Sequence, residues 1–319
     1  MKYALIDSQR KEAERGAKGT CPFCSKPVIA KCGNIKINHW AHKSNSKCDS
    51  WSETETEWHR SWKNNYPTEW QEVILHDEET NEKHIADVRT NNNLIIEFQH
   101  SSIEHNERIA REKFYKNMVW IVDGTRLTRD YPRFKKGFNF TSRYKGKKDI
   151  FLIYSPNRIF PSSWLESTVP VIFDFKGQAD TSDNDEERES IYCLFPLRID
   201  YFGAIFTKLT RSSFVATTKN GIWSSRIEDF LKSEPDFVLN EHRIIEKIPV
   251  KQKRNKFDKD TECEQFSQNQ NQQVIQQPVV YRPRRIILSP RNYGYRRGTQ
   301  INYVKKKQFS KNYKPRKRR

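Results

Sequence analysis

The chain has 319 residues, of which 35% are apolar, 31% charged and 13% aromatic, so it is polar for a globular protein yet aromatic enough to hold a core. These values exclude a chain that is disordered throughout. No stretch approaches the roughly 18 apolar residues of a membrane span, and residues 1–16 hold no apolar run of signal-peptide length. We therefore expect a cytoplasmic protein with no membrane partner.

The formal net charge of +18 belongs mainly to the C-terminal end. Pro278–Arg319 contains about 15 Lys and Arg and no Asp or Glu, which leaves about 43 basic against 40 acidic residues in the rest of the chain. Such a tail suits a polyanion, because each phosphate contact releases condensed counterions. A solubilising tail is the alternative. Residues 251–319, with the Gln/Asn-rich Gln265–Gln277, are too polar to offset chain entropy, so we expect disorder there.

Four of the six cysteines lie within Cys21–Cys48, which indicates a metal site rather than disulfides in a chain without a secretion signal. Cys21 and Cys24 form a CxxC pair, and His39 and His42 follow after 14 intervening residues. Together they offer the four ligands that Zn²⁺ prefers. Cys32 and Cys48 are spare candidates, and Cys48 could replace either histidine. Residues 1–50 are thus predicted to form a structural zinc knuckle without an open catalytic position. Two reduced thiols and two surface imidazoles are the other interpretation.

A β-hairpin is the most informative feature of the next segment. Two β-rich runs flank the turn Asn91–Asn93. A three-residue turn pairs Thr90 with Leu94 and sets Asp87 opposite Glu97 on one face, whereas a four-residue turn puts the two acids on opposite faces. Two carboxylates so close repel unless a proton or a cation such as Mg²⁺ lies between them. The alternative is a Glu97 that points to solvent or pairs with Arg89 or Arg108.

Two helices are expected to flank this hairpin. The first begins at Ser52 with a capping box and sets Glu55, His59 and Lys63 on one stripe, which is either a source of metal or phosphate contacts or a solvated face. The second spans Ser102–Tyr115.

The second helix is expected to bury Ile103, Ala110 and Phe114, and to present Glu104, Arg108, Arg111 and Tyr115 as a row near a phosphate. The apolar run Met118–Asp123 then forms a strand parallel to the one before the helix. The residues expected to contact nucleic acid are His59, Lys63, His100, Ser101, Arg108, Arg111 and Tyr115.

Residues 148–250 read as a β-rich accessory region. Its apolar runs are Asp149–Tyr154, Val169–Phe175, Ile191–Phe195 and Tyr201–Lys208, with an acidic break at Asp180–Glu189. No residue pattern in this region indicates a chemistry.

These motifs, in this order, resemble the CoiA-like competence-protein nucleases of the PD-(D/E)xK superfamily. The resemblance covers about residues 20–125 and rests on Cys-Pro-x-Cys, His-Trp-Ala-His, Glu-x-x-x-His-x-x-x-Lys, Ile-Glu-Phe-Gln-His-Ser and Trp-Ile-Val-Asp. It implies an α/β restriction-endonuclease-like core (51–147) behind the zinc knuckle. It also implies a Mg²⁺-dependent phosphodiesterase with Asp87 and Glu97 as metal ligands, Gln99 where many members carry lysine, and Glu55 at an acidic position of the preceding helix.

The predicted function is a Mg²⁺-dependent endo- or exodeoxyribonuclease that serves DNA uptake and recombination or defence. Asp87 and Glu97 hold the metal, Gln99 orients the nucleophile, and either Glu55 or His59 assists with the metal or with proton transfer. A site without catalytic power is an alternative, because a neutral amide stabilises charge less well than lysine. A second is a non-catalytic zinc-containing nucleic-acid-binding protein. RNA is a less favoured partner than DNA, although the Arg- and Tyr-rich Arg291–Arg297 could stack on single-stranded bases.

Overall fold

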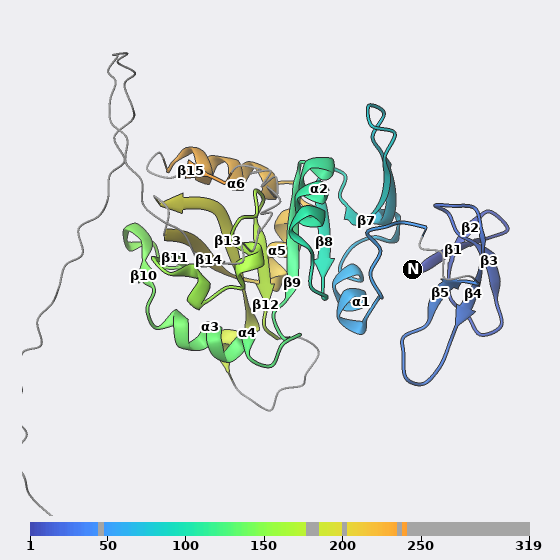
Figure 1. Cartoon of the computed structure of the whole chain (residues 1–319), viewed down its shortest axis with the longest axis horizontal. Helices are drawn as coiled ribbons and strands as arrows, with labels where there is room; N and C mark the ends of the chain where they lie inside the picture. The colour runs from blue at the N-terminus through green and yellow to red at the C-terminus, as the bar shows by residue number, and fades with distance from the viewer. Residues whose placement is uncertain (44–47, 177–184, 200–202, 235–237, 241–319) are drawn as a thin grey trace, which may run out of the picture. The chain divides into compact units, whose positions relative to one another are not determined.

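The computed structural model describes residues 1–43, 48–176, 185–199, 203–234 and 238–240 (Figure 1). All of them belong to one unit, Met1–Ile248. The tail expected to be disordered (251–319) and part of the acidic break lie outside the described residues. In the part of the chain that is described, no helix has the length and apolar character needed to cross a membrane.

The N-terminal part is a five-stranded antiparallel sheet in the order β2-β1-β3-β4-β5. Its strands are β1 (Tyr3–Ile6), β2 (Gln9–Glu12), β3 (Lys18–Thr20), β4 (Pro27–Lys31) and β5 (His39–His42). The buried core of this sheet consists of only a few side chains, among them Val28 and Trp40. So small a core stabilises a fold weakly, and a metal cross-link would add to it.

The rest of the described chain forms one ten-stranded mixed sheet in the order β10-β11-β14-β13-β12-β9-β8-β7-β6, with β15 paired to β13. The central strands are β6 (Gln71–His76), β7 (Lys83–Arg89), β8 (Ile95–Gln99), β9 (Met118–Asp123) and β12 (Val171–Asp174). β8, β9 and β12 are parallel neighbours, as expected for the first two, and β7 and β13 flank them in antiparallel pairs. Every residue of β8 and β9 is buried, as parallel central strands require.

The strands after residue 147 continue this same sheet. They are β11 (Ile150–Ile153), β12, β13 (Ser190–Ile199), β14 (Gly203–Thr210) and β15 (Val238–Leu239), with the short β10 (Ser142–Arg143) before them. The four apolar runs are strands as expected, but they do not form a separate accessory region. Val171 of β12 pairs in parallel with Trp120 of β9, because an apolar central strand left as an edge would expose its unpaired backbone groups.

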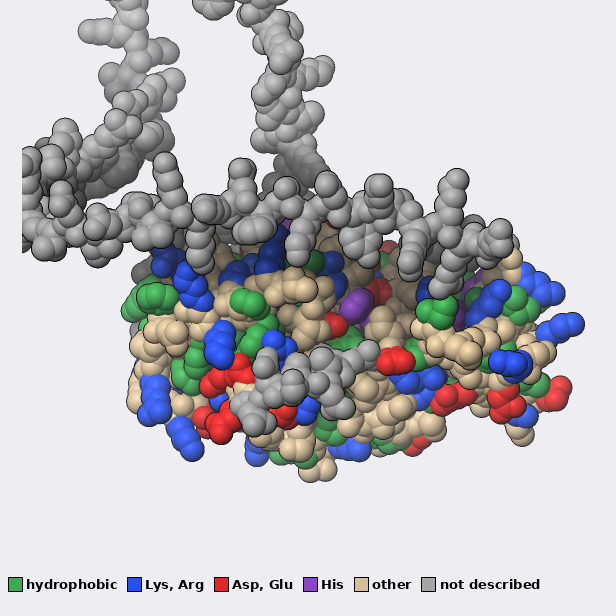
Figure 2. Space-filling view, turned by 90° about the horizontal axis from the view of Figure 1, so that it is seen from below, with side chains coloured by type: hydrophobic (Ala, Val, Ile, Leu, Met, Phe, Trp, Pro, Cys, Tyr) green, Lys and Arg blue, Asp and Glu red, His purple; other side chains and the backbone are tan. Residues whose placement is uncertain are grey.

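The helices cover the sheet. They are α1 (Glu57–Lys63), α2 (His105–Tyr115), α3 (Asp130–Phe138), α4 (Glu186–Glu189), α5 (Arg211–Lys219) and α6 (Trp223–Lys232). Four 3₁₀ turns join the elements, namely η1 (Thr68–Trp70), η2 (Tyr144–Gly146), η3 (Pro156–Arg158) and η4 (Ser162–Trp164). On the face in Figure 2, acidic and basic side chains are interspersed, in line with the nearly neutral composition upstream of the tail.

Helix α1 begins later than the sequence pattern predicts. Its N-cap is Thr56, not Ser52, and the Thr56 hydroxyl accepts from the His59 N–H at 3.3 Å. The Nδ1 atom of His59 accepts from the Thr56 N–H at 3.3 Å and so completes a capping box. His59 therefore occupies the N3 position of the capping box. The sequence pattern looks for Glu or Gln at N3, and for that reason it placed the capping box at Ser52.

Helix α2 turns its charged row toward the sheet. Its buried residues are Arg108, Arg111, Glu112 and Tyr115, whereas Ala110 is exposed. Of the residues expected on the buried face, Ile103 is buried and Phe114 packs against the core, so that expectation fails only at Ala110; the row expected near a phosphate is buried as well, except Glu104. The arginines tolerate burial because they are paired: Arg108 Nη1 lies 2.8 Å from Glu112 Oε1, and Arg111 binds a carboxylate of β8. In Figure 1, α2 lies across β8 and β9.

Asp174, at the end of β12, holds α1 on the sheet. Its Oδ2 atom accepts hydrogen bonds from Trp58 Nε1 at 3.2 Å and Trp62 Nε1 at 3.0 Å, and its Oδ1 atom accepts one from Arg211. Both indoles are buried in a cluster that includes Phe98 of β8. The direction of α1, and of the lysine at its end, is fixed by these contacts.

Candidate active site and metal centre

The hairpin of β7 and β8 has the register in which the two acids face each other. Val88 pairs with Ile96, which sets Asp87 opposite Glu97. The turn between the strands has three residues, and the last of them, Asn93, has a left-handed φ of 57°. Asn tolerates this conformation better than most residues, so the Asn-rich turn accounts for the register. The predicted register, with Asp87 and Glu97 on the same face of the hairpin, is confirmed.

Each acid accepts a backbone hydrogen bond from the opposite strand. The Asp87 N–H donates to Glu97 Oε1 at 3.1 Å, and the Phe98 N–H donates to Asp87 Oδ2 at 3.0 Å. These bonds hold both side chains against the ladder instead of letting them swing to solvent. Both carboxylates line one cavity of about 70 Å³, room for several water molecules.

The electrostatics of this pair are asymmetric. Glu97 is 4% exposed, and burial together with the charge of Asp87 raises the pKa of Glu97 to about 8. Arg111 opposes this shift, with its Nη1 atom 3.2 Å from Glu97 Oε2. At neutral pH Glu97 therefore becomes fully ionised only if a further cation enters the cavity.

Lys63, at the end of α1, reaches the same cavity. Its Nζ atom lies 2.8 Å from Asp87 Oδ1, 3.3 Å from Glu72 Oε1 and 3.8 Å from Glu55 Oε1. Burial alone would lower the pKa of Lys63, but these carboxylates raise it well above its ordinary value. Burial opposes ionisation of Glu72 too, yet Lys63 and backbone N–H groups lower the pKa of Glu72 to about 2. Lys63 is therefore a fixed positive charge beside Asp87.

Glu53, which the sequence patterns did not single out, organises the end of β8. Its carboxylate accepts hydrogen bonds from Gln99 Nε2 and Ser101 Oγ, and from the His100 N–H at 3.3 Å. The Oε1 atom of Gln99 is buried and has no hydrogen-bond partner among the described residues. Gln99 is thus oriented by its amide nitrogen, and its oxygen keeps its capacity to accept. Glu53 lies before the N-cap of α1. The sequence pattern placed it inside the helix instead, and so did not identify it as a site residue.

Three other predicted site residues, Glu55, His59 and Arg111, also line this cavity. Glu55 lines the cavity but is engaged by Arg60, whose Nε atom donates to it at 2.9 Å. His59 donates from Nε2 to the Phe98 carbonyl at 3.0 Å and so joins α1 to β8.

Two residues expected at a nucleic-acid surface do not reach one. Arg108 is fully buried beside Glu112, and Tyr115 packs against Trp51 and Phe114 in the core. Both side chains lie on the face of α2 that packs on the sheet, so neither is placed to contact nucleic acid. His100 and Ser101 lie at the end of β8 and line a different cavity.

A Cys₃His cluster lies in the N-terminal sheet. The ligand atoms of Cys21, Cys24, His42 and Cys48 all lie within 4.8 Å of one another. Cys21 Sγ is 3.9 Å from Cys48 Sγ, and Cys24 Sγ is 3.2 Å from His42 Nε2. Four ligands about 2.3 Å from a tetrahedral ion lie about 3.8 Å apart, so the donor set fits zinc.

His39 does not belong to this cluster, and Cys48 stands in its place. The Nδ1 atom of His39 donates to the Ile37 carbonyl at 2.9 Å. His39 and His42 are the two ends of β5, and residues three apart in a strand point to opposite faces. The ligand set with both histidines requires a helical turn at this place, and the chain forms a strand.

Comparison with known proteins gives two family matches. Residues 5–50 match the N-terminal domain of competence protein CoiA, and residues 77–164 match the nuclease-like domain of competence protein CoiA. The first match contains the whole Cys₃His cluster, and the second contains Asp87, Glu97 and Gln99. Neither the curated proteins nor the solved structures yield a match.

Proposed function

Because this chain carries the N-terminal and the nuclease-like domains of the CoiA competence proteins, we propose that it is a Mg²⁺-dependent nuclease that hydrolyses DNA phosphodiester bonds. The observation that carries the proposal is the pair of carboxylates on Asp87 and Glu97, which face each other in one cavity. The family match favours a role in DNA uptake and recombination over defence.

The residues present fit a hard divalent cation. Such ions prefer carboxylate oxygens and take their remaining ligands from water and phosphate. Asp87 and Glu97 offer these oxygens, and the raised pKa of Glu97 indicates a place where added positive charge is favourable. When bound, Mg²⁺ would lower the pKa of a coordinated water and withdraw charge from the scissile phosphate.

Lys63 is proposed to supply the positive charge that a lysine at the position of Gln99 provides in many PD-(D/E)xK enzymes. Its ammonium lies 2.8 Å from Asp87 Oδ1, although it comes from α1 and not from β8. A fixed ammonium there would stabilise negative charge that develops on the phosphate. Gln99 would accept a hydrogen bond from the attacking water through Oε1, while Glu53 keeps its amide in place.

The N-terminal cluster is proposed to bind a structural Zn²⁺. Four protein ligands leave no position for substrate, and the small core of the five-stranded sheet gains most from such a cross-link. The basic tail is proposed to add salt-sensitive affinity for DNA.

A cleavage assay on linear and circular DNA and on matched RNA, with Mg²⁺ or with EDTA, tests the proposal. Asp87→Asn, Glu97→Gln and Lys63→Met are expected to lower the cleavage rate at least a hundredfold while DNA binding is kept. Glu79→Gln, an exposed acid in the turn before β7, is the matched control. Cleavage that persists in EDTA, or that survives Asp87→Asn, would contradict the proposal. Binding without any cleavage would identify a nucleic-acid-binding protein instead.

A further inference from the structure

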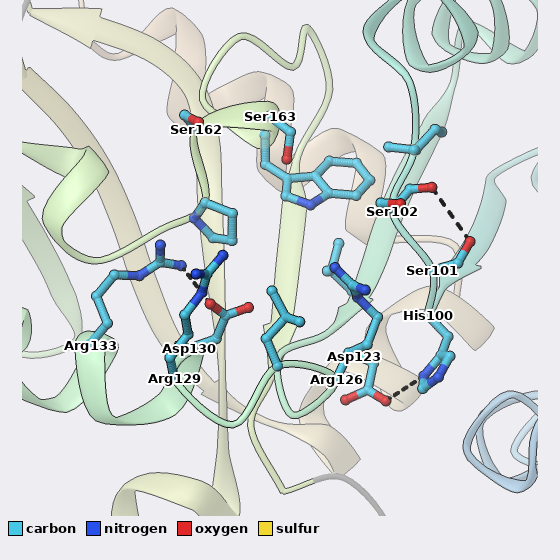
Figure 3. Close-up of a pocket in the computed structure, with 15 residues that line it drawn as sticks. His100, Ser101, Ser102, Asp123, Arg126, Arg129, Asp130, Arg133, Ser162 and Ser163 are labelled. Carbon is cyan, nitrogen blue, oxygen red and sulfur yellow. Dashed lines mark hydrogen bonds and ion pairs between the residues drawn. The ribbon is translucent and has the colours of Figure 1, made fainter.

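A second cavity, of about 190 Å³, opens where β8 and β9 end (Figure 3). Four segments line it: the residues after β8, the loop between β9 and α3, the first turn of α3, and η4. Its polar side chains are His100, Ser101, Ser102, Asp123, Arg126, Arg129, Asp130, Arg133, Ser162 and Ser163. Three guanidinium groups thus meet four hydroxyls in one hollow.

Both acids of this cavity are already engaged. Asp123 Oδ1 accepts from the N–H of Thr125 at 2.8 Å, and its Oδ2 atom lies 2.8 Å from His100 Nδ1. Asp130 Oδ1 lies 3.1 Å from Arg133 Nη2. Arg126 and Arg129 are exposed, and neither has an ion-pair partner among residues 1–43, 48–176, 185–199, 203–234 and 238–240. With His100 counted as neutral, the three arginines and two aspartates that line the cavity leave it with a formal net charge of +1.

The loop that carries Arg126 is held in place. Asp123 caps it through the backbone and hydroxyl of Thr125. Gly124 packs so tightly that a Cβ atom would lie 2.4 Å from the ring of Phe175. Arg129 and Arg133 are four residues apart, hence on one face of α3. The arginines are presented by a fixed framework.

We propose that this cavity binds a phosphate group of the nucleic acid, a few nucleotides from the bond that is cut. The guanidinium fork matches phosphate oxygens in pairs, and the serine hydroxyls add further donors. An uncharged ligand would leave Arg126 and Arg129 without a counter-charge. The position of this phosphate relative to the bond that is cut rests on the proposed function. The binding of phosphate in the cavity does not.

The two cavities are linked through the end of β8. His100 follows Glu97 by three residues, so at about 3.3 Å per residue their Cα atoms lie about 10 Å apart. A distance of this size can be spanned by neighbouring nucleotides of one strand. Glu53 contacts Gln99 and Ser101 and so joins the two cavities. A phosphate held here would set which bond of the strand reaches Asp87 and Glu97.

The phosphate has two sources, an internal diester or a terminal monoester. The test measures the affinity of the full chain for labelled duplexes with a 5′-phosphate, a 3′-phosphate or hydroxyl ends, in EDTA and over a range of salt. The variant is Arg126→Ala with Arg129→Ala. Its control removes two other exposed charges, Lys136→Ala with Arg143→Ala, which do not line the cavity.

The arginine variant is expected to lower the slope of log affinity against log salt by about 2, and the control to leave it unchanged. A preference for one phosphorylated end that the variant loses identifies a terminal monoester, and equal weakening on all duplexes identifies an internal diester. The double Arg→Lys variant should restore the slope.

Equal slopes for the wild-type chain, the arginine variant and the control would overturn the inference. Because the duplexes are not cut in EDTA, a chain without nuclease activity that still shows the arginine effect refutes the proposed function alone. Loss of the thermal transition in the arginine variant is not expected, since both side chains are exposed. If it occurs, Arg126→Gln with Arg129→Gln removes the same two charges with less loss of side chain and repeats the test.

Discussion

Replacing Glu97 by Gln is expected to make the fold more stable in EDTA at high pH, although it removes a site residue. Burial and Asp87 raise the pKa of Glu97 from 4.5 to about 8, so between these values the folded chain binds more protons than the unfolded chain. The contribution of Glu97 to the free energy of unfolding therefore falls as pH rises from 4.5 to 8, and then stays level. Gln at this position does not titrate.

The size of this effect follows from the shift. At about 1.36 kcal/mol per pH unit, the carboxyl of Glu97 costs about 1 kcal/mol at pH 5 and about 5 kcal/mol at pH 9. The variant keeps an acceptor for the Asp87 N–H, and the attraction of Arg111 for the ionised carboxylate is already contained in the pKa of Glu97, so it is not counted again. Relative to the wild type, it should therefore gain about 4 kcal/mol between pH 5 and pH 9 and be the more stable protein at pH 9.

Urea unfolding followed by tryptophan fluorescence at pH 5, 7 and 9 measures this difference, with Glu79→Gln as the matched control. Added Mg²⁺ should then stabilise the wild type and leave the Glu97→Gln variant unchanged. A variant that is less stable than the wild type by the same amount at all three pH values would refute the reasoning. Glu97 would then be an ordinary ionised partner of Arg111.

Three further predictions concern other parts of the molecule. Cys48→Ser should lose the bound zinc, measured by elemental analysis, whereas Cys32→Ser and His39→Ala should keep it; the reverse result would restore the ligand set with two histidines. Asp174→Ala should lower the free energy of unfolding by about 2–4 kcal/mol in urea titrations, because it leaves two buried indole N–H groups unpaired, and a change below about 0.5 kcal/mol would contradict this. Mg²⁺ binding at pH 7 should release about 0.9 proton from Glu97, measured by calorimetry in two buffers of different ionisation enthalpy, and no release would exclude it as a ligand.

Local patterns predicted the features that depend on neighbouring residues. The parity of the hairpin follows from a three-residue Asn turn, and the parallel pair β8 and β9 follows from a helix between two apolar runs. The clustering of cysteines likewise indicated the region of the metal site. In each case the chemistry of a few adjacent residues decides the geometry.

Features set by distant parts of the chain could not be predicted in this way. Lys63 meets Asp87 because Asp174, more than a hundred residues further along the chain, binds two tryptophans of α1. The buried face of α2 is charged because Glu112 pairs with Arg108 and Glu107 pairs with Arg111, and hydrophobic periodicity cannot detect such pairs.

The exchange of His39 for Cys48 has a local cause that spacing alone does not reveal. A pair of histidines three residues apart binds one ion from a helical turn, but these two lie at the ends of a strand. Their spacing is the same in both cases, so only the backbone conformation distinguishes the two ligand sets.

The proposed activity depends on Asp87 and Glu97 holding one divalent cation together. Anomalous diffraction from crystals grown with Mn²⁺ as a substitute for Mg²⁺ tests it most directly. We expect one peak in this cavity, within about 2.0–2.6 Å of a carboxylate oxygen from each residue, and no such peak in the same crystals of Asp87→Asn. A peak that contacts neither acid, or no peak at a Mn²⁺ concentration that supports cleavage, would contradict it.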